Sequence, residues 1–254
     1  MRDRSTHFGG QFEHETHFCE ICAKTAERRP EGPSRFCLQG TQQVRDDPNC
    51  ICNIITSDET WVYGFDPETK QQSSQWNSPD SPRPRKACQV CSNVKSILII
   101  FFNIQGTVYK EFVPPGQIVN GNFHCEVLKR LREGIWRKRP DKWKKNNWFL
   151  HQDNAPAHTS FAVRQFLTSK NITVIPHPPY SPDLAPCRFF LFPKMKLWLK
   201  GRCFVTTEEI HAKTQEVIAT LTFENFKRCM KSWETRWDRC IRAQGDYFKG
   251  DGGN

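Results

Sequence analysis

Two aspartates, Asp58 and Asp153, each follow a short stretch that has the composition of a β-strand, residues 52–56 and 148–152. Nucleotidyl transfer by metal ions needs carboxylates that converge from different strands, so that two divalent cations can lie roughly 4 Å apart. If both strands end at one edge of a sheet, the two carboxylates face the same cleft. An aspartate after a strand is more often a turn former or a helix cap, so the pair alone does not establish this chemistry.

The elements that must position these aspartates follow from hydrophobic periodicity. Further strands are predicted at residues 96–102, 107–113 and 172–175, with a turn at Gln105-Gly106 between the first two. Helices are predicted over 120–139, 156–169, 189–199, 207–221 and 223–242, and prolines make 176–186 an irregular connection. Strands come first, strand and helix then alternate, and helices come last. This order predicts an α/β fold, a mixed sheet flanked by helices.

The chain divides into two parts by composition. Residues 1–49 have no sustained helical or strand period, so they are predicted to be a poorly specified N-terminal segment. Residues 50–254 carry the predicted elements of the folded domain. Within it, residues 66–92 are polar and rich in proline, which indicates a long insertion. Insertions of this length usually have a function or are disordered.

The charge balance favours a polyanionic partner. The 254 residues hold 37 lysines and arginines against 27 aspartates and glutamates, a formal charge of +10, which is typical of proteins that bind nucleic acid. The alternative is a solvated charged surface. The residues expected to contact phosphates are Arg83, Arg85, Lys86, Arg137, Lys138, Arg139, Lys144 and Lys145. The run 137–145 also has the composition of a nuclear localisation patch.

The sequence disfavours a membrane or secreted protein. No stretch reaches the roughly 18 apolar residues of a membrane span, and the first ten residues lack the apolar run of a secretory signal. The twelve cysteines are spread over a chain with enough apolar residues for a core, so we interpret most of them as free thiols. Cys19/Cys22 and Cys88/Cys91 have the spacing of zinc ligands, but they lie too far apart for a zinc ribbon.

Three longer segments resemble the signature blocks of mariner transposases. They are residues 58–70 (DETWVYGFDPETK), 151–158 (HQDNAPAH) and 177–186 (HPPYSPDLAP), and they occur in the order that the family shows. The similarity extends from about residue 47 to residue 248. It implies a ribonuclease-H-like catalytic core that cuts and joins DNA with Mg²⁺ or Mn²⁺ as cofactor, in which Asp58 and Asp153 are the first two catalytic and metal-binding residues.

The third catalytic position of the family falls on an arginine. In mariner transposases 34 residues separate the second and third aspartates, and this spacing from Asp153 reaches Arg188. A guanidinium in place of a carboxylate changes the site by two charges and favours bidentate pairing with the remaining carboxylates. The resemblance therefore predicts an impaired nucleotidyl-transfer centre. Asp183, five residues earlier, is disfavoured as a replacement carboxylate, because it lies in the proline-rich connection, in a block that the family has in addition to its third aspartate.

The resemblance also predicts the partners. DNA is expected to be held mostly through its phosphate backbone, with no small-molecule substrate, and the location is expected to be nuclear. Only 57 residues precede Asp58, too few for the family's two helix-turn-helix units. The insertion 66–92 corresponds to a clamp loop that reaches a partner subunit, so a homodimer is a second expected partner. The alternative function is a DNA-binding module without catalysis.

Overall fold

The computed structural model describes residues 50–67, 92–145 and 148–243. Predictions that concern residues 1–49 and the basic residues Arg83, Arg85 and Lys86 lie outside these ranges. Among the described residues, no helix has the length and apolar character needed to cross a membrane. Cys52, Cys125, Cys187, Cys203 and Cys229 are free thiols, as the composition predicts.

A five-stranded sheet forms the centre of the fold, in the order β3-β2-β1-β4-β5. Its strands are β1 (Ile54–Tyr63), β2 (Lys95–Asn103), β3 (Gly106–Phe112), β4 (Phe149–His151) and β5 (Thr173–Ile175). The pairs β1/β2 and β2/β3 are antiparallel, whereas β1/β4 and β4/β5 are parallel. The predicted mixed sheet is therefore present, and all five predicted strands belong to it.

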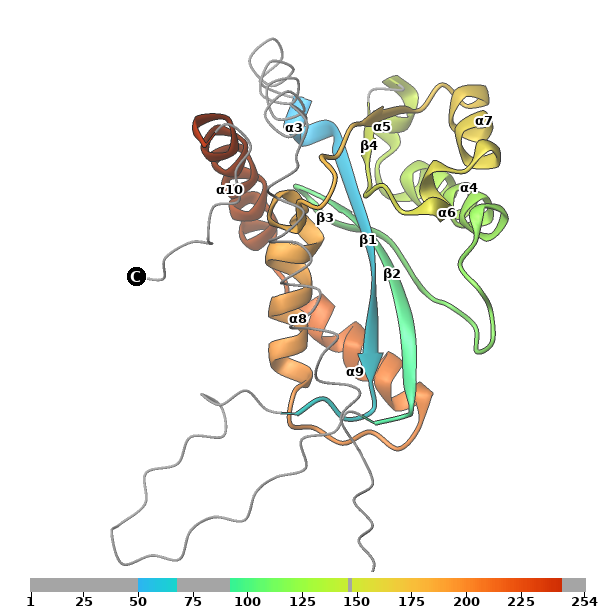
Figure 1. The fold of residues 1–254 in the computed structure, drawn as a ribbon, viewed down its shortest axis with the longest axis vertical. Coiled ribbons are helices and arrows are strands. Elements are labelled where there is room, and N and C mark those ends of the chain that lie inside the picture. Colours follow the sequence, from blue (N-terminus) through green and yellow to red (C-terminus); the bar gives the residue numbers. More distant parts are fainter. Residues whose placement is uncertain (1–49, 68–91, 146–147, 244–254) are drawn as a thin grey trace, which may run out of the picture.

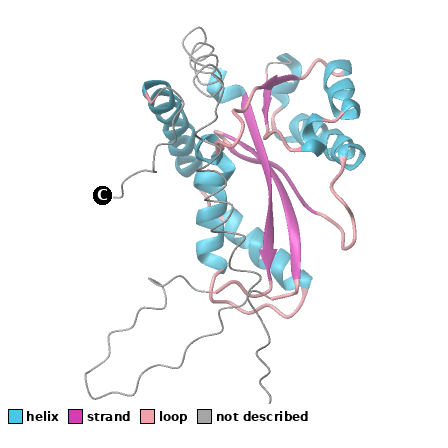
Figure 2. Cartoon of the chain, in the orientation of Figure 1, coloured by secondary structure: helices cyan, strands magenta, loops and turns pink. Residues whose placement is uncertain are grey.

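Helices cover both faces of the sheet (Figures 1 and 2). The helical elements are α3 (Cys50–Asn53), α4 (Gly121–Lys138), α5 (Pro140–Lys145), α6 (Pro156–Thr159), α7 (Phe161–Ser169), η1 (Pro182–Leu184), η2 (Cys187–Leu191), α8 (Phe192–Leu199), α9 (Thr207–Ala219) and α10 (Phe223–Arg242). In Figure 1, α4, α6 and α7 lie on one side of β1 and β2, and α8 and α10 lie on the other.

The side chains of β1 and β2 alternate between two separate apolar cores. Ile54, Leu98 and Ile100 pack in a core with residues of α8, α9 and α10. Ile55 and Ile99 pack in a second core with residues of α4 and α7. Because successive strand residues point to opposite faces, neighbouring side chains along β1 belong to different sides of the sheet.

The first strand is longer than predicted, which corrects the position of Asp58. The prediction ended this strand at residue 56 and placed Asp58 after it, but β1 runs from Ile54 to Tyr63 and Asp58 lies inside it. The cause is antiparallel pairing with β2, which continues from Thr56 to Tyr63. Long-range pairing therefore holds polar residues in a strand that local composition would end.

The predicted helix over 156–169 is two helices, separated at Ser160. Ser160 is extended (φ −60°, ψ 154°), and its hydroxyl accepts a hydrogen bond from the backbone N–H of Val163. Ser160 is therefore the N-cap of α7, which starts at Phe161. This break allows the start of α4 to come close. A Cβ added to Gly121 would lie 2.2 Å from the Ser160 hydroxyl oxygen, so only glycine fits there.

The predicted helix over 189–199 begins earlier, with a π-turn. In η2 the backbone N–H of Phe192 donates to the carbonyl of Cys187, and the α-helix α8 follows. Pro193 lacks an N–H, and its ring would clash with the carbonyl four residues earlier in a regular α-helix. The wider turn relieves this clash and carries Arg188, and single π-turns of this kind are frequent at functional sites.

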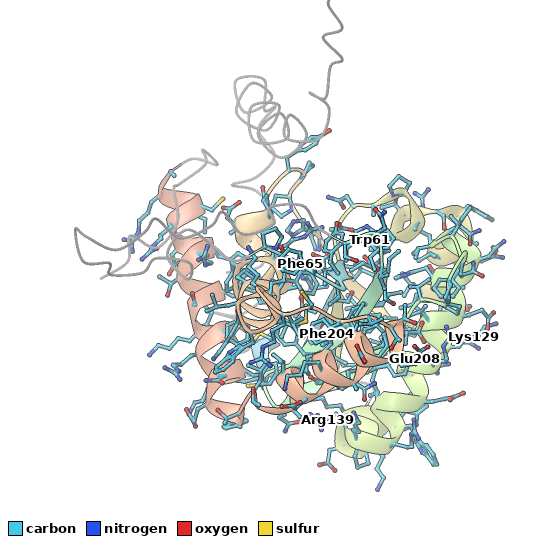
Figure 3. The ribbon with its side chains drawn as sticks, turned by 90° about the horizontal axis from the view of Figure 1, so that it is seen from below. Trp61, Phe65, Lys129, Arg139, Phe204 and Glu208 are labelled. Carbon is cyan, nitrogen blue, oxygen red and sulfur yellow. The ribbon has the colours of Figure 1, made fainter. Side chains whose placement is uncertain are left out.

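The two ends of the predicted insertion lie together, although residues 68–91 are outside the described ranges. Gly64 donates its N–H to Val94 and Ser92 donates to Phe65, so the chain leaves and re-enters the sheet at one place. Phe204 donates its N–H to the carbonyl of Gly64 at 2.6 Å. Figure 3 shows Phe65 and Phe204 near one another at this end of β1.

Candidate active site

Parallel pairing of β1 with β4 brings Asp58 and Asp153 to one edge. The last parallel pair is Thr56 with His151, and each aspartate lies two residues beyond its member of that pair. Asp58 and Asp153 therefore occupy equivalent positions, where β1 and the segment after β4 stop pairing. Burial is the main cause of the raised pKa of Asp58, and the negative charge of Asp153 also contributes to it. The structure thus brings together the two residues that the sequence predicts as metal ligands.

Arg188 pairs with Asp58 through two nitrogens. Its Nε donates to Oδ2 of Asp58 at 2.5 Å, and its Nη2 donates to Oδ1 at 3.3 Å. The Asp58 side chain is 3% exposed, and that of Arg188 is 48% exposed. Burial raises the pKa of Asp58 to about 6 although the guanidinium opposes the rise. At neutral pH this carboxylate is therefore ionised and already has a cationic partner.

Asp153 is held by a histidine five residues later. His158 contacts Oδ1 of Asp153 through Nδ1 at 2.7 Å and Oε1 of Glu59 through Nε2 at 3.0 Å. Burial disfavours a charge on His158, but the two carboxylates outweigh burial and raise its pKa to about 10. Burial likewise would raise the pKa of Asp153, whereas the hydrogen bond and charge of His158 lower it to about 2.

A second histidine, His124 on α4, lies beside His158. Their ring centroids are 4.3 Å apart, and Nε2 of His124 lies 3.1 Å from Oε1 of Gln152. His124 is fully buried, and its Nδ1 has no hydrogen-bond partner among the described residues. Burial lowers the pKa of His124 to about 4, so the ring is neutral at pH 7.

A chain of buried hydrogen bonds connects β1 with the other two motif segments. Thr56 Oγ1 lies 2.9 Å from Nδ1 of His151, and Nε2 of His151 lies 3.1 Å from Nδ1 of His177. Asn154 donates its side-chain N–H to the carbonyl of His177 at 2.7 Å. These contacts fix the segment 151–158 against the segment 177–186, on the side of the sheet where Trp233 packs on the ring of His151.

Comparison with known proteins identifies relatives of this fold. The profile of a family described as Transposase (partial DDE domain) matches residues 66–145. Mariner Mos1 transposase of Drosophila mauritiana is 32% identical over 198 residues, which is 77% of this chain and 56% of that protein. The structure of the Mos1 transposase catalytic domain with raltegravir and Mn aligns with this fold at a TM-score of 0.73 and 28% identity. The alignment covers 88% of this chain and 98% of the Mos1 chain.

The chain belongs to the mariner-type transposase family. Its fold is the ribonuclease-H-like fold of the Mos1 catalytic domain, as the sequence predicts. The Mos1 paired-end complex with left transposon end gives a TM-score of 0.78 at 26% identity, covering 98% of this chain and 68% of that chain.

A human protein is similar to this mariner-type domain over most of its length. The histone-lysine N-methyltransferase SETMAR of Homo sapiens is 23% identical over 229 residues, 90% of this chain but 32% of SETMAR. The mariner-type domain thus spans about half of Mos1 transposase and a third of SETMAR.

Buried histidines make the stability of the mariner-type domain depend on pH. Burial lowers the pKa of His177 and His124 to about 4 and that of His151 well below 6.5. The unfolded chain binds protons on these rings near pH 6.5, whereas the folded chain does not. The stability that they contribute is therefore fully present above pH 6.5 and is lost as the pH falls toward 4. For His124 and His177 the loss is on the order of 2 kcal/mol each at pH 5.

Urea unfolding at pH 7 and pH 5 tests this expectation. The raised pKa values of Asp58 and His158 stabilise the fold as the pH falls, so they offset part of the loss. We expect a net decrease of a few kcal/mol in the free energy of unfolding at pH 5. His177→Gln removes one titrating ring and should reduce the difference between the two pH values. Equal stability at both would contradict the burial of these rings.

The predicted DNA-binding residues that the structure describes lie at the far end of α4. Arg137 and Lys138 are in its last turn, Arg139 is its C-cap, and Lys144 and Lys145 are in α5. At 1.5 Å per residue, Arg137 and Lys138 are about 20 Å along α4 from His124. Arg137, Lys138 and Lys144 are exposed, whereas Arg139 is half-buried and donates to the carbonyl of Lys138.

A groove between α4, α5 and α7 adjoins this basic end. It is lined by Lys129, Arg132, Glu133, Trp136, Trp143, Phe166 and Lys170. The guanidinium of Arg132 lies 4.9 Å from the ring centre of Trp143, and Trp136 is 60% exposed. Figure 3 shows Lys129 on the α4 side of the molecule. Aromatic rings among cationic side chains are typical of surfaces that contact nucleic acid.

Sequence reasoning did not assign roles to Glu59, His124 and His158. For two of them the sequence holds a pattern that could have indicated a role. Glu59 follows Asp58 in a strand and must point to the other face of the sheet. His158 lies in the first turn of a helix that starts beside Asp153. No sequence pattern indicates a role for His124, because its contact with His158 depends on how α4 packs against α6.

Proposed function

We propose that this mariner transposase-derived domain binds DNA through phosphate contacts and that its nucleotidyl-transfer centre is impaired by Arg188. The observation that carries the proposal is the pairing of Arg188 with both carboxylate oxygens of Asp58. The catalytic roles of Asp58 and Asp153, and the replacement of the third aspartate by arginine, come from the family resemblance.

The residues at this edge do not fit a pair of divalent cations. Mos1 transposase has been solved with Mn and with Mg, and such ions need carboxylate oxygens that are available. Here Arg188 holds Asp58, while Oδ1 of Asp153 accepts from the backbone N–H of Ala155 and contacts His158. With a guanidinium where a third carboxylate would lie, the negative charge is too small for two ions.

The exposed cations of α4 and α5 support DNA binding. Phosphate contacts by such residues give an affinity that falls steeply with salt and that carries little sequence information. Mos1 structures of a transpososome and of complexes with paired ends are relatives of this fold. We propose that duplex DNA is the partner here, that the location is nuclear, and that two copies of the chain form a homodimer.

Measuring binding and cleavage together tests the proposal. We expect purified protein to bind duplex DNA with salt-sensitive affinity and neither to nick supercoiled DNA in Mn²⁺ nor to join transposon ends to a target. Changing Arg137, Lys138 and Lys144 to alanine should reduce the slope of log affinity against log salt by about one for each phosphate that the protein no longer neutralises. Arg164→Ala, on α7, is a control for removal of one exposed positive charge elsewhere.

Two outcomes separate the alternatives. Salt-sensitive binding without any nicking favours a DNA-binding module without catalysis. Nicking that disappears in both Asp58→Ala and Asp153→Ala indicates residual catalysis at these carboxylates. Efficient joining by the unchanged protein would overturn the impairment, and affinity that is independent of salt would overturn the phosphate-contact interface.

A further inference from the structure

Two histidines and a glutamate converge on the face of β1 opposite Asp58. Glu59 is on β1, His124 is on α4 and His158 is on α6. One potential ligand atom of each lies within 4.8 Å of the other two. A tetrahedral zinc ion with bonds of about 2.0–2.1 Å sets its ligand atoms roughly 3.4 Å apart, so small side-chain movements are enough to bring these atoms to zinc-binding distances.

His124 has the hydrogen bonding of a metal-binding imidazole. The side-chain oxygen of Gln152 can only accept, so Nε2 of His124 carries the hydrogen in their 3.1 Å contact. The lone pair of a neutral ring then lies on Nδ1, which is buried and has no partner among the residues that the structure describes. Histidines that bind metals almost always donate their other ring N–H to an oxygen in this way.

His158 is oriented by a carboxylate in the same manner. Its Nδ1 contacts Asp153 at 2.7 Å, which directs Nε2 toward Glu59 at 3.0 Å. The side chain of His158 is 1% exposed, whereas that of Glu59 is 20% exposed, so the group of three has one side open to solvent. A cation bound by Nε2 and Glu59 would replace the proton between them, and that proton would pass to solvent.

We propose that Glu59, His124 and His158 bind a single Zn²⁺ ion, with Gln152 and Asp153 orienting the two imidazoles. Two histidines and one glutamate form a known zinc ligand set that leaves a fourth position for water. Imidazole nitrogens suit zinc, whereas Mg²⁺ prefers oxygen ligands. The ion would connect β1, α4 and α6. Arg188 and Asp58 have no part in this site, which shares with the impaired carboxylate pair only Asp153, through its contact with His158.

Titration of the purified full chain with Zn²⁺, in competition with a chromogenic chelator, tests the site. We expect one equivalent to bind and to raise the melting temperature. His124→Phe and Glu59→Gln should each weaken binding by more than about a hundredfold, and Gln152→Ala by about ten- to a hundredfold. The control is His211→Phe, since His211 on α9 contacts Ser96 and lies outside the group of three. Unchanged affinity in His124→Phe would overturn the proposal.

Two further measurements distinguish the proposed site from other groups that could bind the metal. Co²⁺ bound to nitrogen and oxygen gives a visible spectrum without thiolate charge-transfer absorption, so such absorption would place the ion on cysteines and overturn the proposal. Loss of binding in Asp58→Asn but not in His124→Phe would place it on the catalytic carboxylates and also overturn it. If His124→Phe does not fold, the graded loss in Gln152→Ala decides the matter, because that side chain does not contact the ion.

Discussion

Replacing Arg188 with aspartate is expected to tighten Mn²⁺ binding at Asp58 and Asp153 by roughly ten- to a thousandfold. A charge pair about 4 Å apart contributes about 4 kcal/mol at an effective dielectric constant near 20, which corresponds to about a thousandfold in affinity. Because the Arg188 side chain is 48% exposed, solvent screens part of this interaction and sets the lower bound.

Isothermal titration of the two proteins with Mn²⁺ measures the change. Arg188→Gln removes the cation without adding a carboxylate, so it should give a smaller increase than Arg188→Asp. Adding Asp58→Asn to Arg188→Asp should cancel the gain. The titrations should be repeated with His124→Phe, so that an ion at the histidine site is not counted. If Mn²⁺ binds equally to the unchanged protein and to Arg188→Asp, the guanidinium does not limit metal binding.

Most elements could be predicted from the sequence because their patterns are local. The amphipathic period of residues 120–139 matches α4 to within one residue at each end, and its predicted start at Asn120 is the N-cap that accepts from the N–H of Phe123. Residues 223–242 were predicted with the bounds of α10. The apolar run 96–102 is a buried central strand, because β2 pairs on both sides.

The differences arise where contacts between distant residues decide the structure. Asp58 lies within a strand because β2 pairs with β1 beyond it. The helix breaks at Ser160 where Gly121 of α4 comes close. At the site, the resemblance gave the spacing from Asp153 to Arg188, and the charge of Arg188 predicted its pairing with a carboxylate. The partner of Asp153 was not foreseen, since His158 also needs Glu59 and the packing of α6 to hold its position.

Trp233→Ala is expected to destabilise the fold by about 3–5 kcal/mol, a large part of the stability of a typical domain. Trp233 on α10 is fully buried, and its ring centre lies 4.6 Å from that of His151 and 4.6 Å from that of Trp237. Its removal leaves a cavity beneath His151, so the hydrogen bond between His151 and His177 should also weaken.

Two matched substitutions separate packing from other effects of losing a tryptophan. The indole N–H of Trp233 has no hydrogen-bond partner within the described part of the chain. Trp233→Phe removes this unsatisfied donor and leaves a smaller cavity, so it should cost less than the alanine variant. Trp198 is 56% exposed on α8, and Trp198→Ala should change stability by less than about 0.5 kcal/mol. Guanidinium unfolding followed by circular dichroism gives all three values. A Trp233→Ala protein as stable as Trp198→Ala would mean that α10 does not support the sheet beneath the edge that carries Asp58 and Asp153.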